Sequence, residues 1–226
     1  GHTPFGHAGE AALNEICPLG FSHFKQSIRV VELLEKNGEG LNLSWEVRDG
    51  IVNHRTAGTP HTLEGQVVRL CDKISYIHHD MDDAERAGIF SEDDIPITIR
   101  VILGDSCRER LNSLIHDIIT TSYGKDKVEM SPEVEEAMMS LRKLMFASVY
   151  RNPIAKKEEK KAERMLQEMY LHYAKHSGAM SSEYRELIQR GEPLERVVCD
   201  YISGMTDQYS MAKYKELFVP SGWAVY

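Results

Sequence analysis

The first ten residues, GHTPFGHAGE, place two histidines and a carboxylate around a Pro-Phe-Gly turn. His7 and Glu10 are three residues apart, so on a helix they share one face. An imidazole titrates near neutral pH, and a neighbouring carboxylate can orient it and stabilise its charge. His2, His7 and Glu10 are therefore candidates for acid–base chemistry, although a pair of hydrogen-bonded surface groups would explain the same spacing.

Two further stretches carry polar residues within apolar helical patterns. In GFSHFKQSIRVV, His23 lies beside aromatic and aliphatic residues. A histidine in such a position is either a functional residue or an interior side chain whose hydrogen bonds are satisfied within the protein. In LCDKISYIHHDMDDA, Asp72, Tyr76 and Asp80 recur at intervals of four residues and flank the apolar face. A carboxylate beside a buried stripe is costly unless it is paired or bound to a cation, and the adjacent Lys73 could meet a phosphate. A salt-bridged surface stripe remains the alternative.

The adjacent pair His79 and Asp80 looks like a His-Asp metal dyad, but neighbouring residues of a helix point about 100° apart. The apolar period continues through Met81, so the helix does not end there and we reject this pair as a metal site. The chain also lacks the Gly-x4-Gly-Lys-Ser/Thr phosphate loop and the Gly-x-Ser-x-Gly nucleophile turn. Chemistry that depends on those two motifs is therefore excluded.

The elements that must position these residues are helices. The hydrophobic period is helical along nearly the whole chain and no convincing strand pair is present, so the sequence predicts an all-α fold. The best-defined helix starts after the N-cap Thr62, ends near Ala87, and has a predicted buried stripe of Val67, Leu70, Cys71, Ile74, Ile77 and Met81. We predict further helices over residues 8–16, 21–35, 41–51, 105–123, 132–150, from 153 onward, 182–190, 193–203 and 207–218. In the helix over 105–123, the predicted interior positions are Leu111, Leu114, Ile115, Ile118 and Ile119.

Composition limits the class of protein. The 226 residues, 42% of them hydrophobic, suffice for one large domain or for a domain with a helical appendage. The net charge of −8 argues against general nucleic-acid binding. No run of about 18 apolar residues occurs, so no membrane span is expected. The widely spaced Cys17, Cys71, Cys107 and Cys199 predict reduced, mostly buried thiols in a cytoplasmic protein.

Taken together, the motif-bearing stretches resemble the deoxyguanosinetriphosphate triphosphohydrolase-like branch of the HD-domain phosphohydrolases. The similarity lies in GHTPFGHAGEAALNEI, GFSHFKQSIRVV, GLNLSWEVRDGI and TLEGQVVRLCDKISYIHHDMDDAERAGI, with weaker similarity in LRKLMFASVYRN and the closing tail. The resemblance implies an HD-domain helical bundle with a helical C-terminal extension. We expect a partial HD-type phosphohydrolase domain over residues 1–125 and a helical C-terminal region over residues 126–226.

The resemblance implies hydrolysis of a deoxynucleoside triphosphate, possible substrates including dGTP, to the deoxynucleoside and inorganic triphosphate. Asp72 would be a ligand of a divalent cation such as Mg²⁺ or Mn²⁺, and His7 and Glu10 would be the catalytic pair. In the family a His-Asp dyad immediately precedes the residue that matches Gly1, and a further histidine comes earlier. We therefore expect this chain to lack an N-terminal segment, to bind metal weakly and to be inactive alone.

The resemblance also implies a set of substrate contacts. The phosphate groups would meet His2, His23 and Lys73. The deoxyribose 3′-hydroxyl would be held by Tyr76 and Asp80, with the tyrosine ring excluding a 2′-hydroxyl. Weaker candidates for phosphate contacts on the following helix are Arg108 and Arg110.

Two other functions stay open from the sequence. One is a non-catalytic helical fragment or regulatory module that needs another segment or chain. The other is a different HD-type nucleotide phosphohydrolase, such as a 5′-nucleotidase or a cyclic-nucleotide phosphodiesterase, against which the stripe of Asp72, Tyr76 and Asp80 argues. The resemblance implies a homo-oligomer that binds a dNTP substrate, for which dGTP is a candidate. The composition predicts neither a membrane nor a nucleic acid as a partner.

Overall fold

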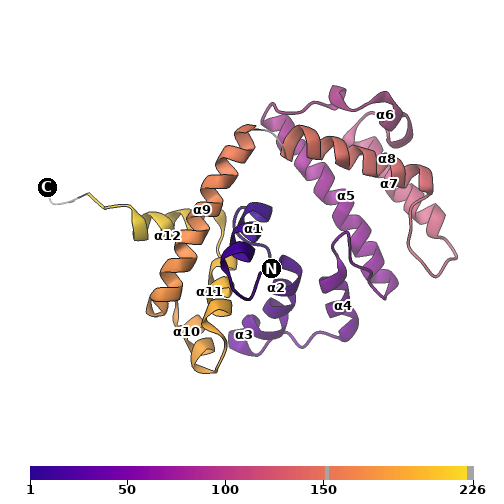
Figure 1. The fold of residues 1–226 in the computed structure, drawn as a ribbon. Coiled ribbons are helices and arrows are strands. Elements are labelled where there is room, and N and C mark those ends of the chain that lie inside the picture. The colour runs from indigo at the N-terminus through magenta and orange to yellow at the C-terminus, as the bar shows by residue number, and fades with distance from the viewer. Residues whose placement is uncertain (151–152, 223–226) are drawn as a thin grey trace. The chain divides into compact units, whose positions relative to one another are not determined.

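The computed structural model describes residues 1–150 and 153–222. Within these residues every regular element is a helix and no strand occurs, which confirms the predicted all-α fold (Figure 1). Contacts divide the chain into two compact units, Gly1–Ser44 with Lys157–Tyr226 (unit 1) and Trp45–Lys156 (unit 2). The boundaries of these two units differ from the boundary expected at residue 125. That expected boundary marked the end of the HD-type domain, and its position stays a prediction.

Unit 1 is built from both ends of the chain. The N-terminal part holds α1 (Gly6–Ile16), α2 (His23–Arg29), the π-helical segment η1 (Val30–Leu34) and α3 (Glu35–Gly38). The C-terminal part holds most of α9 (Pro153–Lys175), then η4 (Ser177–Ala179), α10 (Ser182–Gln189), α11 (Leu194–Ser203) and α12 (Asp207–Phe218). Helices α1, α9 and α11 supply most of its core, which includes Ala12, Leu13, Leu166, Met169, Tyr173, Val197, Val198 and Ile202.

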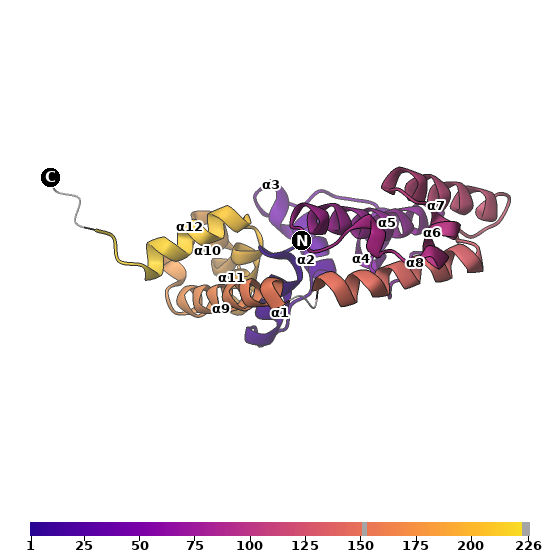
Figure 2. The ribbon, with the colours of Figure 1, turned by 90° about the horizontal axis from the view of Figure 1, so that it is seen from above.

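Unit 2 is continuous in sequence. Its elements are α4 (Trp45–Asn53), α5 (Leu63–Arg86), η2 (Glu92–Asp94), α6 (Ile97–Leu103), α7 (Cys107–Ser122), α8 (Pro132–Met145) and the π-helical η3 (Phe146–Tyr150). Helix α5 packs against α4, α7 and α8, and α6 packs against α7 and α8, as the run of α8 beneath α6 in Figure 2 shows. The core of this unit includes Leu70, Ile74, Ile77, Met81, Leu103, Leu114, Leu141 and Met145.

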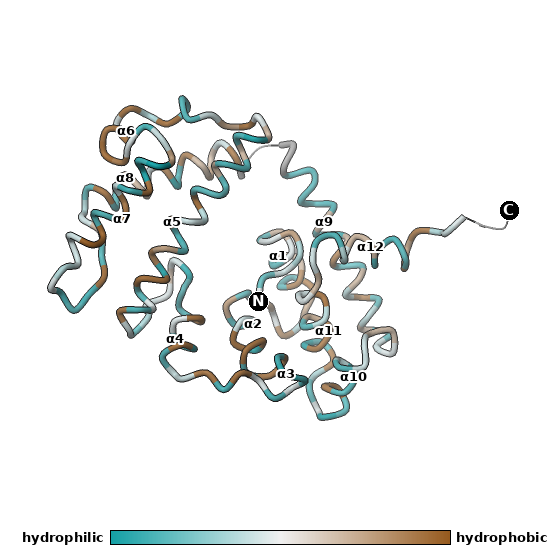
Figure 3. Tube along the Cα trace, turned by 180° about the vertical axis from the view of Figure 1, so that it is seen from behind, coloured by the Kyte–Doolittle hydropathy of each residue, from teal (hydrophilic) through white to brown (hydrophobic). Residues whose placement is uncertain are grey.

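Helix α5 is the element that the sequence predicted best. The Thr62 hydroxyl accepts a hydrogen bond from the Gly65 N–H at 3.1 Å, and the helix ends at Arg86, two residues before the left-handed Gly88. Four of the six positions in the predicted stripe are buried. Val67, at 44% exposure, and Cys71 are exposed, because no helix packed on α5 covers them. Figure 3 shows the alternation of hydrophobic and hydrophilic positions along α5 that accompanies this one-sided burial.

Other elements depart from the prediction where packing outweighs periodicity. The expected helix over residues 21–35 is interrupted by η1, and the expected helix over 41–51 begins only at Trp45. Helix α6, rich in β-branched residues, was not predicted and is helical because Ile99 and Leu103 are buried in the core. Ile115 and Ile119, predicted to be interior, are 49% and 60% exposed.

The four cysteines are all free thiols. Cys17 and Cys199 are buried, Cys107 is half-buried and Cys71 is exposed, so the prediction of mostly buried thiols is correct for only two of them. None of the helices in the described part of the chain combines the length and the apolar character that a membrane span requires.

Candidate functional site

The candidate residues fall into two sets, His2, His7, Glu10 and His23 in unit 1, and Asp72, Lys73, Tyr76 and Asp80 in unit 2. In unit 1 the chain reverses before α1 through Phe5 and Gly6, which have φ angles of 60° and 54°. The opening segment then lies so close to the helix that a Cβ atom on Gly9 would sit 2.0 Å from the Pro4 carbonyl oxygen. A glycine at this position therefore allows the segment that carries His2 to fold back against α1.

The carboxylate of Glu10 joins α1 to the first residue of α2. Its Oε1 accepts a hydrogen bond from the His23 backbone N–H at 3.0 Å, and its Oε2 lies 2.8 Å from His23 Nδ1. The His23 ring in turn stacks on the His2 ring, with centroids 4.8 Å apart and planes 13° apart. The fold thus brings three of the four predicted residues of unit 1 into one contiguous group.

The electrostatics of Glu10 include the fourth residue. Burial by itself raises the pKa of Glu10, but the hydrogen bonds from the His23 side chain and backbone, with the charges of His23 and His7, outweigh it and lower the pKa below its ordinary value. Glu10 is therefore ionised at neutral pH. His7 lies exposed on the first turn of α1, one turn before Glu10. The pairing of His7 with Glu10 as catalytic groups stays a prediction, and His23 is the imidazole that Glu10 orients directly.

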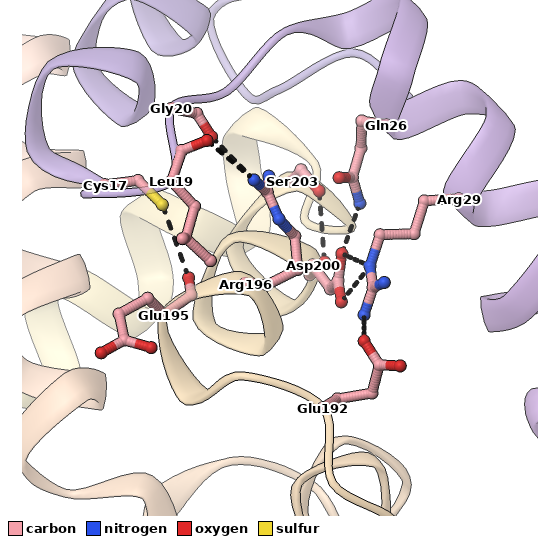
Figure 4. A network of polar contacts seen from close by, with 10 residues as sticks. All are labelled: Cys17, Leu19, Gly20, Gln26, Arg29, Glu192, Glu195, Arg196, Asp200 and Ser203. Atoms are coloured by element: carbon pink, nitrogen blue, oxygen red, sulfur yellow. Dashed lines mark hydrogen bonds and ion pairs between the residues drawn. The ribbon is translucent and has the colours of Figure 1, made fainter.

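A buried ion-pair network holds α2 from its other side (Figure 4). Asp200 on α11 is fully buried and accepts from Gln26 Nε2 at 2.8 Å and from Arg29 Nε at 2.8 Å. Arg29 Nη2 also donates to Glu192 at 2.6 Å. This network could not be found from the sequence, since Asp200 is more than 170 residues away from its partners on α2 and no local pattern relates them.

In unit 2 the candidate residues lie along one helix, α5. Asp72 is exposed, Tyr76 is 41% exposed, and Lys73 and Asp80 are half-buried. Burial raises the pKa of Tyr76 to about 12, and the negative charges of Asp80 and Asp72 act in the same direction while Arg142 opposes them. The stripe that the spacing predicted is thus a set of side chains close enough to influence one another.

Asp80 is the most unusual member of the set. Its Oδ2 atom is buried and, among the residues that the structure describes, has no hydrogen-bond partner. Burial, reinforced by the charge of Asp83, raises the pKa of Asp80 to about 6. A buried acceptor without a donor is rare in folded proteins, and it is the expected state of a group that a ligand hydroxyl completes.

Two arginines join this face that the sequence did not single out. Burial lowers the pKa of Lys73, and the positive charges of Arg69 and Arg142 lower it further against the opposing charge of Glu135. Arg69 precedes Lys73 by one helical turn, and Arg142 comes from α8. Arg142 lies in the stretch LRKLMFASVYRN, which is weakly similar to the family. That similarity was the feature of the sequence that could have identified Arg142 as a candidate.

The weaker candidate Arg110 has a different role. It is fully buried and forms two hydrogen bonds with Glu92, which ties α7 to η2. Arg110 is therefore unavailable to a phosphate, and that expectation is wrong. Arg108 is exposed.

The rejected dyad of His79 and Asp80 lies in the middle of α5, which continues to Arg86. Among the described residues, no group of three or more His, Cys, Asp or Glu side chains could hold a metal ion. The one predicted ligand, Asp72, offers the oxygen donors that Mg²⁺ and Mn²⁺ prefer.

Comparison with known proteins adds independent information. Residues 128–216 match the model of a phosphohydrolase-associated domain, a range that extends over parts of both units. A deoxyguanosinetriphosphate triphosphohydrolase-like protein of Caldanaerobacter subterraneus subsp. tengcongensis is 49% identical over 224 residues, which cover 99% of this chain and 66% of that protein. Proteins with the same description are 42% identical in Clostridium perfringens, covering 97% of this chain and 67% of the relative, and 34% identical in Geobacter sulfurreducens, covering 97% and 71%. The chain thus spans about two thirds of the length of these curated relatives.

Proposed function

The chain belongs to the deoxyguanosinetriphosphate triphosphohydrolase-like family, and on this premise we propose that it carries part of the active site of a metal-dependent dNTP hydrolase. The reaction converts a deoxynucleoside triphosphate, with dGTP as the first substrate to test, into the deoxynucleoside and inorganic triphosphate. Water attacks the α-phosphorus, the bond from that phosphorus to the 5′-oxygen breaks, and the 5′-oxygen takes up a proton.

The observation that carries this proposal is the unpartnered Oδ2 of Asp80 on α5. A deoxyribose 3′-hydroxyl supplies the donor that this buried acceptor lacks, since an unmade hydrogen bond to a buried charged group is costly. Tyr76, one turn earlier, is in position on the same helix to pack against the sugar and to exclude a 2′-hydroxyl. The set is therefore suited to a deoxynucleotide.

Binding of the triphosphate falls to the cations of the same face. The free protein holds three cations close together here, Lys73, Arg69 and Arg142. Burial lowers the pKa of Lys73 most, and repulsion by the two arginines lowers it further. An anion placed among them relieves that repulsion and offsets negative charge that develops on the phosphoryl oxygens. His2 and His23 are the corresponding phosphate contacts proposed in unit 1.

Proton transfer is assigned to the group on α1 and α2. His7, when protonated, gives its proton to the departing 5′-oxygen. Glu10 stays ionised because its pKa is lowered, so it holds positive charge on the imidazoles beside it. Two hydrogen bonds fix Glu10 to His23, which keeps the orientation of the group constant through the reaction.

Asp72 is the residue of this chain that would hold a divalent cation. When bound, such a cation lowers the pKa of water and neutralises phosphate charge. A single carboxylate binds a divalent cation weakly, so ligands beyond those of the described residues are required.

The test is product analysis. The full-length protein, with the N-terminal segment that the family resemblance implies, is incubated with dGTP and Mn²⁺, and the products are separated by anion-exchange chromatography. We expect deoxyguanosine and inorganic triphosphate in equal amounts, and no product from a Lys73→Ala, Asp80→Asn double variant. Release of only orthophosphate or pyrophosphate would refute the proposed bond cleavage.

A further inference from the structure

Unit 1 contains a cavity of about 650 Å³ whose cationic side chains have no role in the proposed reaction. Its wall is formed by α1, the loop between α1 and α2, α2 itself and Arg196 of α11. The polar side chains that line it include Glu10, Asn14, Lys25, Gln26, Arg29 and Arg196. A cavity of this volume can hold a small organic ligand or a nucleotide.

The lining is rich in hydrogen-bond donors that have no acceptor. The exposed Lys25 ammonium has no ion-pair or hydrogen-bond partner within the described part of the chain. Arg29 uses Nε and Nη2 in its bonds to Asp200 and Glu192, which leaves Nη1 uncommitted among the described residues. Three cationic side chains thus line the cavity with donors to spare.

The two arginines are held in place before any ligand arrives. The guanidinium of Arg29 forms ion pairs with the fully buried Asp200 and with Glu192, which restrict its position (Figure 4). Arg196 Nη2 donates to the backbone carbonyls of Leu19 and Gly20 at 3.2 and 3.0 Å. Because these contacts restrict both side chains, a ligand that meets them loses little additional side-chain entropy on binding.

The carboxylate in the lining does not cancel this positive character. Both oxygens of Glu10 already accept hydrogen bonds from His23, one from the backbone N–H and one at the imidazole. The Asn14 Oδ1 atom likewise accepts from the Phe21 N–H at 2.9 Å, which leaves its amide NH₂ as a donor. The groups that remain available to a ligand are therefore mainly donors, three of them on cations.

We propose that this cavity binds the phosphate groups of a small phosphorylated anion, either an inorganic oligophosphate or a nucleoside phosphate. Arginine and lysine donors held around a concave surface form charge-assisted hydrogen bonds with phosphate oxygens. All the residues that line the cavity belong to unit 1, and none of them is a cation of α5. The proposal stands whether or not the proposed hydrolysis is correct. Phosphate binding here requires no divalent metal, since the cationic side chains supply the charge.

The test is calorimetric titration of the chain with inorganic triphosphate in EDTA. Lys25→Glu reverses a charge on an exposed side chain and should weaken binding about tenfold or more. Lys160→Glu makes the same change in net charge on an exposed position of α9 outside the cavity, and should leave the affinity within about twofold. Lys25→Arg should retain binding. Equal affinities for Lys25→Glu and Lys160→Glu, or no binding of triphosphate by the wild type, would overturn the proposal.

Two further titrations identify the ligand and the residues that bind it. Titration with dGTP in EDTA separates the sources: tighter binding than triphosphate, lost in Lys25→Glu, identifies a nucleoside phosphate, and equal or weaker binding identifies the inorganic anion. Lys73→Ala removes a cation of the proposed substrate site on α5, so the triphosphate binding that this variant retains and that Lys25→Glu weakens belongs to the cavity. Loss of binding in that variant would assign the anion to α5 and would also overturn the proposal.

Discussion

The two units treat their buried polar groups in different ways. In unit 1, Asp200 accepts from Gln26 and Arg29, and Glu10 accepts twice from His23. In unit 2, buried side-chain atoms without a hydrogen-bond partner accumulate. Of the seven such atoms among the described residues, six lie in unit 2, on Arg48, Arg69, His78, Asp80, Arg100 and Arg110, and one lies in unit 1, on Tyr170.

Buried polar groups with hydrogen-bond partners stabilise the packing of helices, whereas a buried polar group without a partner is a candidate for ligand binding. A satisfied buried network holds helices in one arrangement, as Asp200 does for α2 and α11, whereas an unsatisfied group raises the free energy of the folded state. The Nε of Arg100 lacks a hydrogen bond but lies 3.5 Å from Asp105 Oδ1 in an ion pair. The Nε of Arg110 also lacks a hydrogen bond, and the same guanidinium pairs with Glu92 through Nη2. Asp80 has no such compensation among the described residues, so its unmet acceptor is the one that a ligand would satisfy.

The largest effect is expected from breaking the satisfied network. Asp200→Ala removes the buried partner of Gln26 and Arg29 and should lower the free energy of unfolding by about 3–5 kcal/mol. Urea unfolding followed by circular dichroism measures the loss. Glu158→Ala, which breaks the exposed pair with Lys161, should change stability by about 0.5 kcal/mol or less. If both variants are equally stable, the network does not hold α2 and α11 together.

Asp80→Asn should have the opposite balance of effects. Removing a charge that has no partner should leave stability unchanged or higher, while substrate loses a charge-assisted hydrogen bond and its KM rises about 10- to 100-fold. The pKa of about 6 adds a pH signature, because a raised pKa keeps the carboxyl protonated in more acidic solution. The wild-type KM should therefore fall as pH rises from 5 to 7, and the variant should lack this dependence.

Asp83→Asn is the matched control for that prediction. The Asp83 side chain is 75% exposed, one turn along α5, and its charge contributes to the raised pKa of Asp80. Neutralising it should leave KM near neutral pH unchanged and should shift the pH dependence to lower pH. An unchanged KM in Asp80→Asn would remove the sugar-binding role.

The sequence predicted local features and missed those that depend on distant contacts. The cap at Thr62 and the spacing of Asp72, Tyr76 and Asp80 are properties of one helix, and they were visible because helical geometry has a fixed period. The pairing of Glu10 with His23 required knowledge of how α1 meets α2, and spacing alone led instead to His7. Asp200 and Arg142 could not be placed beside α2 and α5 because their partners lie on other helices, far away in sequence.

A smaller effect is expected at the link between α1 and α2. Glu10→Gln keeps the shape but loses the charge, and should lower the free energy of unfolding by about 1–2 kcal/mol at pH 7. Since the folded-state pKa of Glu10 is lowered, its contribution is present above the unfolded value of 4.5 and is lost as pH falls through the lowered value. The variant should therefore be closest to wild type in acid. Glu15→Gln, an exposed change on the same helix, is the control, and an equal loss there would contradict this role of Glu10.

The smallest effect, and the finest test of the difference between the units, is at His78. Its Nδ1 donates to the Ile74 carbonyl at 2.7 Å, its Nε2 is buried without a partner among the described residues, and burial lowers its pKa. The unfolded chain therefore binds a proton more readily than the folded one, so stability is complete above the unfolded pKa of 6.5 and declines as pH falls through it. His78→Leu should change stability at pH 8 by about 1 kcal/mol or less and should flatten the melting temperature between pH 7 and 5.5. The control is His116→Leu, on the exposed face of α7, which should keep the wild-type dependence of melting temperature on pH. If His78→Leu also keeps that dependence, the unpaired nitrogen of His78 does not resist protonation.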